Sequence, residues 1–180
     1  MFSSRLWNLF IDSFPKMFIR GLTVTIPLTA IAFSLAMVIA VIVALVQFAN
    51  IKVLKQICRF YIWIFRGTPL LVQLFIVFFG LMNVGLVLEP FLAAVIVFAL
   101  NEGAYGAETV RASLESVPSG QLEAGQCAGL SYLQTIFRIV LPQAMRTAFP
   151  SLFNALISML KDTSLAATIT VTEMFKVSQQ

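Results

Sequence analysis

The chain has 180 residues, of which 59% are hydrophobic and only 11% are charged, with a formal net charge of +4. Soluble domains carry about 25% charged residues, so this composition indicates a membrane protein and argues against a globular domain. The chain has no histidine, which excludes histidine-based catalysis and most zinc sites, and its positive charge is better explained by membrane-flanking residues than by nucleic-acid binding.

The first 20 residues form an amphipathic segment. Polar residues take one face of this segment. Apolar residues recur at helical spacing on the other face: Leu6, Phe10, Ile11, Phe14 and Phe18. We expect this segment to lie in the membrane interface, and its pattern differs from that of a signal peptide.

Four apolar segments follow, at about residues 22–48, 60–81, 89–105 and 150–175. No charged residue lies between Arg20 and Lys52 or between Arg66 and Glu89. Each of these gaps holds the roughly 20 residues that a helix needs to cross a bilayer. The sequence therefore predicts an all-α membrane protein, a single domain over residues 1–180, with about four spans.

Basic residues near the segment ends predict the orientation. Lys and Arg lie in the turn before the second segment and around the loop before the fourth, whereas the turn between the second and third has neither. Cytoplasmic loops carry the excess of Lys and Arg, so we expect these two loops in the cytoplasm and the N-terminus outside. Arg5, Lys16 and Arg20 would then lie on the less favoured side.

Two interruptions in the apolar segments are candidates for a binding site. Gly67 and Pro69 loosen the second segment around Thr68, and Pro69 leaves a helix carbonyl without its usual donor. Such backbone at membrane depth is tolerated only where protein or water satisfies it. The fourth segment contains Lys161 and Asp162, an ionisable pair that indicates a site, with a neutralised pair at a helix break as the structural alternative.

A polar loop at about residues 109–145 separates the third and fourth segments. Pro118 can open a short helix over residues 120–128, and Ser116 or Ser119 can cap it. Glu108 and Arg111, just before this loop, have the spacing of an ion pair on one helix turn, which we expect to be structural.

The second half of the loop predicts a corner and another helix. Gly129 suits the left-handed position that ends a helix, and Ser131 with Gln134 has the spacing of a capping box. We expect Ile139, Leu141 and Pro142 to close this second helix and turn the chain back to the membrane. Two short helices with a glycine corner would form a rigid knob that can transmit force.

This loop contains a motif with fixed spacing. A Glu-Ala pair is followed after four residues by Gly, and after nine more residues by Ile-x-Leu-Pro. The residues of the motif are Glu123, Ala124, Gly129, Ile139, Leu141 and Pro142. This spacing resembles the EAA loop of the membrane subunits of ABC importers. Gly125 stands where that loop usually has a second alanine, which keeps the residue small. The resemblance implies that Glu123, Ala124, Gly125, Gly129, Leu141 and Pro142 couple the chain to a separate ATPase.

A second set of motifs is similar to the permeases of the polar amino acid uptake family: Arg66-Gly67-Thr68-Pro69-Leu70-Leu71-Val72-Gln73, Ala107-Glu108, Leu141-Pro142-Gln143-Ala144 and Lys161-Asp162-Thr163-Ser164-Leu165. The likeness runs from about Phe18 onward. It implies the transmembrane domain of a type I ABC importer in a bacterial cytoplasmic membrane. The family usually has five core spans, and the fifth is expected after residue 175, where little of this chain remains.

The resemblance also implies partners. They are two cytoplasmic ATPase subunits, an extracytoplasmic solute-binding protein and a second permease, identical or paralogous. The chain has no Gly-x-x-x-x-Gly-Lys-Ser/Thr, so we expect no catalytic residue, no metal and no cofactor of its own, with ATP and magnesium on the ATPase.

We expect the chain to form the pathway through which this importer moves polar amino acids. Hydroxyls and freed backbone donors suit a carboxylate, and acidic side chains suit an ammonium group. The candidate substrate residues are Gly67, Thr68, Asp162, Ser164 and Glu173. Helix packing is the alternative explanation for each of them.

Three other classes of protein explain the sequence less well. An ion-gradient-driven secondary transporter of amino acids would explain Lys161-Asp162 and the broken helices, but not the loop, and the sequence has no visible inverted repeat. An intramembrane enzyme is disfavoured, because the chain has no histidine for a serine–histidine dyad or for a zinc site. A non-transporting membrane anchor would fit the absence of the fifth span.

Overall fold

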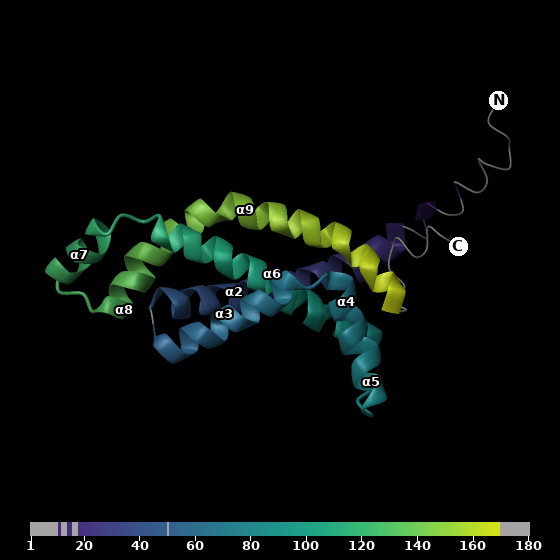
Figure 1. Cartoon of the computed structure of the whole chain (residues 1–180). Coiled ribbons are helices and arrows are strands. Elements are labelled where there is room, and N and C mark those ends of the chain that lie inside the picture. Colours follow the sequence, from purple (N-terminus) through teal and green to yellow (C-terminus); the bar gives the residue numbers. More distant parts are fainter. Residues whose placement is uncertain (1–10, 12–13, 16–17, 50, 170–180) are drawn as a thin grey trace. The chain divides into compact units, whose positions relative to one another are not determined.

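The structure is a computed structural model that describes residues 11, 14–15, 18–49 and 51–169. All regular elements within these ranges are helical (Figure 1). Most of the amphipathic segment over residues 1–20, the end of the predicted fourth span and Glu173 lie outside the described residues, so those expectations stay predictions.

The helices follow one another with short connections. After a π-helical turn at Gly21–Thr25, the elements are α2 (Ile26–Phe48), α3 (Lys52–Gly67), α4 (Leu70–Phe75), a π-helical turn (Ile76–Gly80), α5 (Leu81–Asn83), α6 (Pro90–Glu115), α7 (Gly120–Cys127), α8 (Tyr132–Thr135), a π-helical turn (Ile136–Val140), α9 (Leu141–Asp162) and a 3-10 helix (Thr163–Ile169). This order agrees with the predicted all-α membrane protein.

Two helices in the described part of the chain are long and apolar enough to cross a membrane: Phe18–Phe48, which includes α2, and α6. The pair α3 and Leu70–Asn83, interrupted between them, would make a third. Helix α9 corresponds to the fourth predicted segment and is not among these candidates, because polar residues are spread along its whole length.

The helix boundaries differ from the predicted ones at two places. Residues 52–59, expected in a polar turn, belong to α3, since Lys52, Lys55 and Arg59 fall on one face of an amphipathic helix. Helix α6 extends ten residues beyond the predicted end at residue 105, to Glu115. Its added turns are held by side-chain pairs three and four residues apart.

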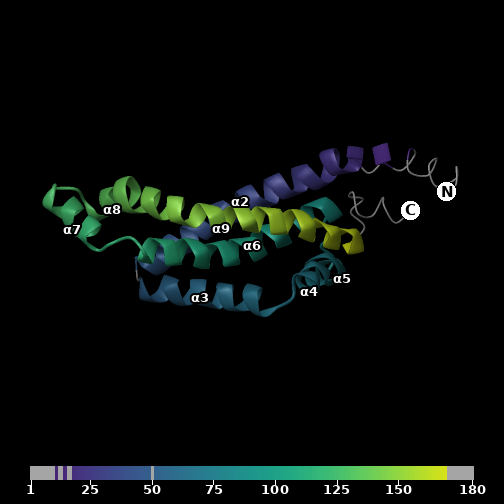
Figure 2. The ribbon, with the colours of Figure 1, turned by 90° about the horizontal axis from the view of Figure 1, so that it is seen from above.

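The chain divides into two compact units. The first contains Met1–Leu35, Thr68–Ala99 and Leu156–Gln180, and the second contains Ala36–Gly67 and Leu100–Ala155. In the first unit, the 3-10 helix Thr163–Ile169 packs against α4. In the second unit, α7 and α8 lie at the tip beside the ends of α6 and α9, as both views show (Figures 1 and 2).

Helix α2 is apolar around its whole circumference. Its buried face repeats every four residues: Leu28, Ala32, Ala36, Ala40 and Ala44. Its exposed face consists of larger apolar side chains: Ile31, Leu35, Val38 and Ile42. Small residues let membrane helices approach closely, whereas an exposed apolar face suits contact with lipid.

The core of the second unit joins α2, α6, α9 and the π-helical turn before α9. Its buried members are Ala44, Val110, Leu114, Ile136, Val140, Ala144, Ala148 and Leu152. A smaller cluster joins α3 to α6 through Ile62, Ala104 and Ala107. The Tyr61 hydroxyl also donates a hydrogen bond of 2.5 Å to the Leu100 carbonyl of α6.

Two glycines of α6 allow this close packing. A Cβ atom at Gly106 would lie 3.0 Å from the Ala40 Cβ and 3.3 Å from the Met37 Cε. A Cβ atom at Gly103 would lie 2.9 Å from the Ile39 Cγ2. Larger residues at either position would therefore force α2 and α6 apart.

We predict that Gly106→Leu lowers the unfolding temperature of the detergent-purified protein, since overpacking a close helix contact costs about 1–3 kcal/mol. Gly120→Leu is the matched control, because nothing lies within 4 Å of a Cβ at Gly120. Thermal unfolding followed by circular dichroism measures both. Equal unfolding temperatures for the two variants would show that the α2–α6 contact is not tight.

Candidate functional site

The segment between the long helices is shorter than the predicted loop of residues 109–145. Residues 109–115 continue α6, and residues 141–145 begin α9. The remaining stretch, residues 116–140, is termed the knob below; it contains α7, α8 and the π-helical turn that leads into α9. The knob is therefore mostly helical.

The first helix of the knob is α7, close to the predicted residues 120–128. The expected side-chain caps are wrong: Ser119 makes no capping hydrogen bond, and the Ser116 hydroxyl donates to the Ser113 carbonyl at 2.8 Å. Helical backbone at Ser119 turns its side chain away from the first free amides. The first turn is held by backbone bonds, with the Gln121 N–H donating to the Pro118 carbonyl at 2.9 Å.

The predicted corner at Gly129 is confirmed. Gly129 has a φ of +77°, in the left-handed region that glycine adopts without a Cβ penalty. The Leu130 N–H donates to the Gly125 carbonyl at 3.0 Å, and the Gly129 N–H donates to the Gln126 carbonyl at 2.9 Å. These two bonds form a complete Schellman motif, which satisfies the carbonyls at the end of α7.

The predicted capping box is also confirmed. The Gln134 N–H donates to the Ser131 Oγ at 3.3 Å, and the Ser131 N–H donates to the Gln134 Oε1 at 2.9 Å. Helix α8 therefore begins at a fixed residue directly after the corner.

The expectation that Ile139, Leu141 and Pro142 close the second helix is wrong. Helical backbone continues from α8 through the π-helical turn into α9. In that turn the Leu141 N–H donates to the Ile136 carbonyl, five residues back. Hydrogen bonding shifted in this way accommodates a proline, which cannot donate to the ladder. Leu141 packs against the core of the second unit, and Pro142 is exposed.

Gly125 is where α7 meets α8. A Cβ at this position would lie 2.5 Å from the Thr135 Oγ1, and closer still to the Thr135 Cγ2. Thr135 is fully buried, and its hydroxyl donates to the Ser131 carbonyl at 3.1 Å, so it has little room to move. Thr135 therefore requires a glycine at position 125, where the EAA loop usually has its second alanine.

The knob is attached to the core on two sides. Leu122 of α7 packs against the core of the second unit, where Ile136 and Val140 are buried members. The Gln143 Nε2 of α9 donates to the Gln121 Oε1 of α7 at 3.3 Å and to the Ile139 carbonyl at 3.1 Å. Glu123 and Ala124 remain exposed on the outer side of α7.

The predicted break in the second span separates α3 from α4. Helix α3 ends at Gly67, and Pro69 has extended backbone with a φ of −63° and a ψ of 138°. The Pro69 carbonyl accepts hydrogen bonds from the Val72 and Gln73 amides, at 3.0 Å and 3.2 Å, which starts α4.

Two side-chain amides satisfy the loosened backbone, and the sequence interpretation gave a role to neither. The Asn101 Nδ2 donates to the Phe65 carbonyl at 3.2 Å, replacing the donor that Pro69 lacks. The buried Gln73 donates from its Nε2 to the Thr68 carbonyl at 3.1 Å and to the Thr68 Oγ1 at 2.8 Å. The signal for Gln73 was a polar residue among apolar ones, five positions after Thr68.

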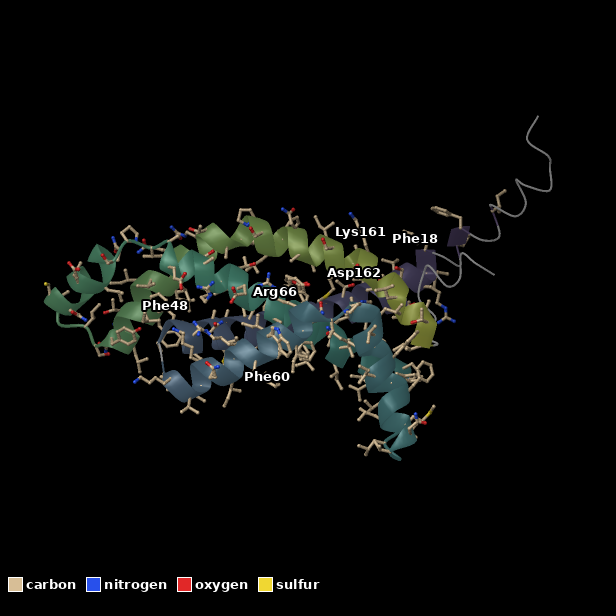
Figure 3. All side chains as sticks on the ribbon, in the orientation of Figure 1. Phe18, Phe48, Phe60, Arg66, Lys161 and Asp162 are labelled. Atoms are coloured by element: carbon tan, nitrogen blue, oxygen red, sulfur yellow. The ribbon has the colours of Figure 1, made fainter. Side chains whose placement is uncertain are left out.

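The other candidate substrate residues lie around the end of α9. Helix α9 ends at Asp162, where the Thr163 hydroxyl donates to the Leu160 carbonyl at 2.7 Å. Among the described residues no ion pair within 4 Å joins Lys161 to Asp162, and the Lys161 side chain points outward in Figure 3. The ionisable pair therefore marks a helix end, where a cation complements the helix dipole.

The candidate substrate residues are only partly brought together. Thr68 precedes α4, and Ser164 belongs to the 3-10 helix that packs against α4, so these two lie on contacting elements of the first unit. Asp162 is in the same unit, Gly67 belongs to the second unit, and Glu173 lies outside the described residues.

A network of charged side chains connects α3 and α6 in the second unit. The predicted pair of Glu108 and Arg111 is confirmed, with the Arg111 Nη2 3.1 Å from the Glu108 Oε2. The Arg111 Nη1 lies 2.6 Å from the Glu115 Oε1. Arg66 lies over the Tyr105 ring and has its Nη1 3.8 Å from the Glu108 Oε2.

Comparison with known proteins gives consistent results. The chain is 45% identical over 174 residues to the L-cystine transport system permease protein TcyB of Bacillus subtilis, covering 97% of this chain and 74% of that protein. It is 36% identical to the nopaline transport system permease protein NocM of Agrobacterium fabrum, covering 96% of this chain and 76% of the relative.

Solved structures match as well. A crystal structure of an amino acid ABC transporter with histidines superposes with a TM-score of 0.84 at 33% identity, covering 95% of this chain and 80% of that one. The inward-facing MetNI methionine ABC transporter shows the same fold, with a TM-score of 0.77 at 22% identity over 92% of this chain and 81% of that one.

These matches agree with a family comparison that covers most of the chain. Residues 36–180 match the family described as "Binding-protein-dependent transport system inner membrane component". Both relatives are named as permease proteins of transport systems. The chain belongs to the binding-protein-dependent transport system inner membrane component family, as a non-catalytic ABC transporter permease.

Proposed function

We propose that this chain imports polar amino acids across a bacterial cytoplasmic membrane as the permease subunit of an ATP-driven transporter. The complete transporter would also contain a second permease copy or paralogue, a pair of cytoplasmic ATPases and an extracytoplasmic solute-binding protein. The relatives named above transport cystine and nopaline, both amino-acid derivatives, which supports this substrate class. The likeness of this chain to solved ABC transporters also favours an ATPase as the energy source over an ion gradient.

The observation that carries the proposal is the construction of the knob. An exposed helix, α7, ends in a Schellman motif, meets α8 without space for a methyl group, and is attached to α9 and the core by Gln121 and Leu122. A segment fixed at this many points moves as a rigid body. We infer that Glu123 and Ala124 face a groove of the ATPase, and that Gly125, Gly129, Leu141 and Pro142 hold α7 at the required angle.

ATP and magnesium would be bound by the ATPase, because this chain contains no phosphate-binding glycine loop. Closure of the ATPase pair would push or pull α7. The π-helical turn and α9 continue directly from α8, so the displacement would reach α9 without passing through a flexible linker.

For the substrate, we propose that the hydroxyls of Thr68 and Ser164 and the backbone at Gly67 bind the carboxylate, with Asp162 and Glu173 around the ammonium group. Gln73 orients Thr68 by donating to its Oγ1 and carbonyl. Asp162 stands at a helix end without an ion-pair partner within 4 Å among the described residues, which leaves its charge for a cation.

Replacing Gly129 tests the corner. Gly129→Val should uncouple transport from ATP hydrolysis, because a β-branched residue in the left-handed region is strained by more than the roughly 1–2 kcal/mol of an ordinary residue. Gly129→Asn is the matched control, since asparagine tolerates this conformation. Uptake and ATP hydrolysis are measured with the reconstituted complex, and normal uptake by Gly129→Val would remove the corner from the mechanism.

The Gly125–Thr135 contact gives a test with a built-in rescue. We expect Gly125→Ala to reduce uptake at least several-fold, because the added methyl group displaces α7 from α8. Thr135→Ala removes the two atoms nearest the added methyl, so the double variant should recover most of the uptake. A double variant no better than Gly125→Ala would contradict the packing argument.

Asp162→Ala should abolish uptake while the complex still assembles, because it removes the acceptor proposed for the substrate ammonium. Lys161→Ala, which deletes the neighbouring charge, should retain uptake. Uptake in proteoliposomes and co-purification of the ATPase with each variant provide the two measurements. Full uptake by Asp162→Ala would exclude Asp162 from the substrate site.

A further inference from the structure

Helix α9 has two exposed faces of different character. No charged residue lies between Arg146 and Lys161, so other side chains decide the polarity of this stretch. One exposed face is apolar: Phe149, Phe153, Ile157 and Leu160. The other exposed face is polar: Thr147, Ser151, Asn154 and Ser158. Successive members of each set are three or four residues apart, which places each set on one side of the helix.

The remaining side of α9 packs against helices that can cross a membrane. Ala148 and Leu152 belong to the core of the second unit, together with residues of α2 and α6. Helix α6, and the longer helix that contains α2, are the two candidate spans of the described residues. A Cβ at Gly106, which is well inside α6, would lie 3.9 Å from the Leu152 Cδ2. The polar face of α9 therefore lies at a depth where lipid chains surround any outer surface of the protein.

The polar side chains of this face are not satisfied by the chain itself. Among the described residues, no hydrogen bond joins the side chain of Ser151, Asn154 or Ser158 to another group. The Thr147 hydroxyl does donate, to the Gln143 carbonyl at 3.3 Å. Leaving polar groups without partners in hydrocarbon costs free energy, so we expect this face to meet something other than lipid.

Helix α2 and the turn before it show how exposed hydroxyls are accommodated on an otherwise apolar helix. The Thr23 hydroxyl donates to the Ile19 carbonyl at 2.8 Å, and the Ser34 hydroxyl donates to the Ala30 carbonyl at 2.7 Å. A hydroxyl bonded to its own helix needs no partner outside the helix. Ser151 could make the same bond four residues back in α9 and does not. Its hydroxyl is therefore available to a partner outside the chain.

Water explains the polar face of α9 better than a neighbouring helix does. A single polar residue can bond to another helix, as Asn101 of α6 bonds to the Phe65 carbonyl of α3. On α9, polar residues instead recur at every turn from Thr147 to Ser158, over about 17 Å at the helical rise per residue. Asp162 is exposed and continues the same face one turn further. Ionisable residues in membrane helices characteristically face a water-filled cavity.

We propose that this polar face lines the water-filled path along which the substrate leaves Asp162 for the cytoplasmic end of α9. The inference rests on the proposed function, which places Asp162 at the substrate ammonium. Hydroxyl and amide groups can exchange hydrogen bonds with a carboxylate and with an ammonium. Because Ser151, Asn154 and Ser158 carry no charge, none of them holds the substrate as strongly as a charged residue would, and weak successive contacts favour release.

Cysteine labelling tests whether this face meets water. Cys58→Ala and Cys127→Ser remove the native thiols, and single cysteines are then placed in matched pairs: Asn154→Cys with Phe153→Cys, and Ser158→Cys with Ile157→Cys. The members of a pair are adjacent, so they differ in depth by only about 1.5 Å but point about 100° apart. All four native residues are exposed, and only the face differs.

The full chain, in its complex with the ATPase, is labelled in nanodiscs with a charged methanethiosulfonate reagent, with and without ATP. In at least one of these two states we expect Asn154→Cys and Ser158→Cys to react at least about tenfold faster than their neighbours, because the thiolate reacts and apolar surroundings suppress it. Ser158→Cys exchanges a single atom, so it should fold even where a larger change does not. Co-purification of the ATPase checks assembly of each variant.

Uptake by the labelled complexes tests whether the substrate uses this path. The charged group attached at Ser158→Cys should remove most amino-acid uptake in proteoliposomes, whereas Ile157→Cys treated in the same way should retain it. Equal labelling rates within both pairs, in both states, would overturn the proposal. Full uptake by completely labelled Ser158→Cys would also overturn it. Absence of amino-acid uptake by the unlabelled native complex would instead contradict the proposed function, and the labelling rates would still show whether this face meets water.

Discussion

The contact between Gly125 and Thr135 is the constraint on which the rest of the knob depends. The backbone of α7 at Gly125 lies directly against the buried Thr135 side chain of α8, so a Cβ at residue 125 would collide with the threonine. The Gly125 carbonyl is also the acceptor for the Leu130 N–H that closes the corner. One residue therefore sets both the packing and the hydrogen bonding of the turn, and a small residue alone meets both requirements.

Close approach of small residues also holds the long helices together. Ala40 of α2 lies against Gly106 of α6, and Ala44 is buried with Val110 and Leu114 of α6. Such close contacts replace the hydrophobic driving force that is absent within a bilayer. Larger apolar side chains are left on the outside, where lipid covers them. The helices are thus arranged by shape, and the knob inherits its position from α6 and α9, to which it is attached.

Buried polar side chains in the described part of this apolar frame are nearly all hydrogen-bonded. The side-chain amides of Asn101 and Gln73 donate to backbone carbonyls next to Pro69, which cannot donate to the helix ladder itself. Arg111 neutralises two carboxylates at once.

The sequence by itself determined what depends on composition and on neighbours a few residues apart. Apolar segments predicted the helices of a membrane protein, and the preference of glycine for left-handed backbone predicted the corner at Gly129. The capping box at Ser131 and the Glu108–Arg111 pair were predicted from spacings of three residues. Such local bonds form whenever the backbone is helical, so their spacing is sufficient evidence. The expectations for Ser119 and Pro142 failed because backbone angles and a π-helical turn, which spacing does not specify, decided them. Only the tertiary structure could show Asn101 on the Phe65 carbonyl or Thr135 against Gly125, because these contacts join residues whose distance in the sequence carries no information about their distance in space.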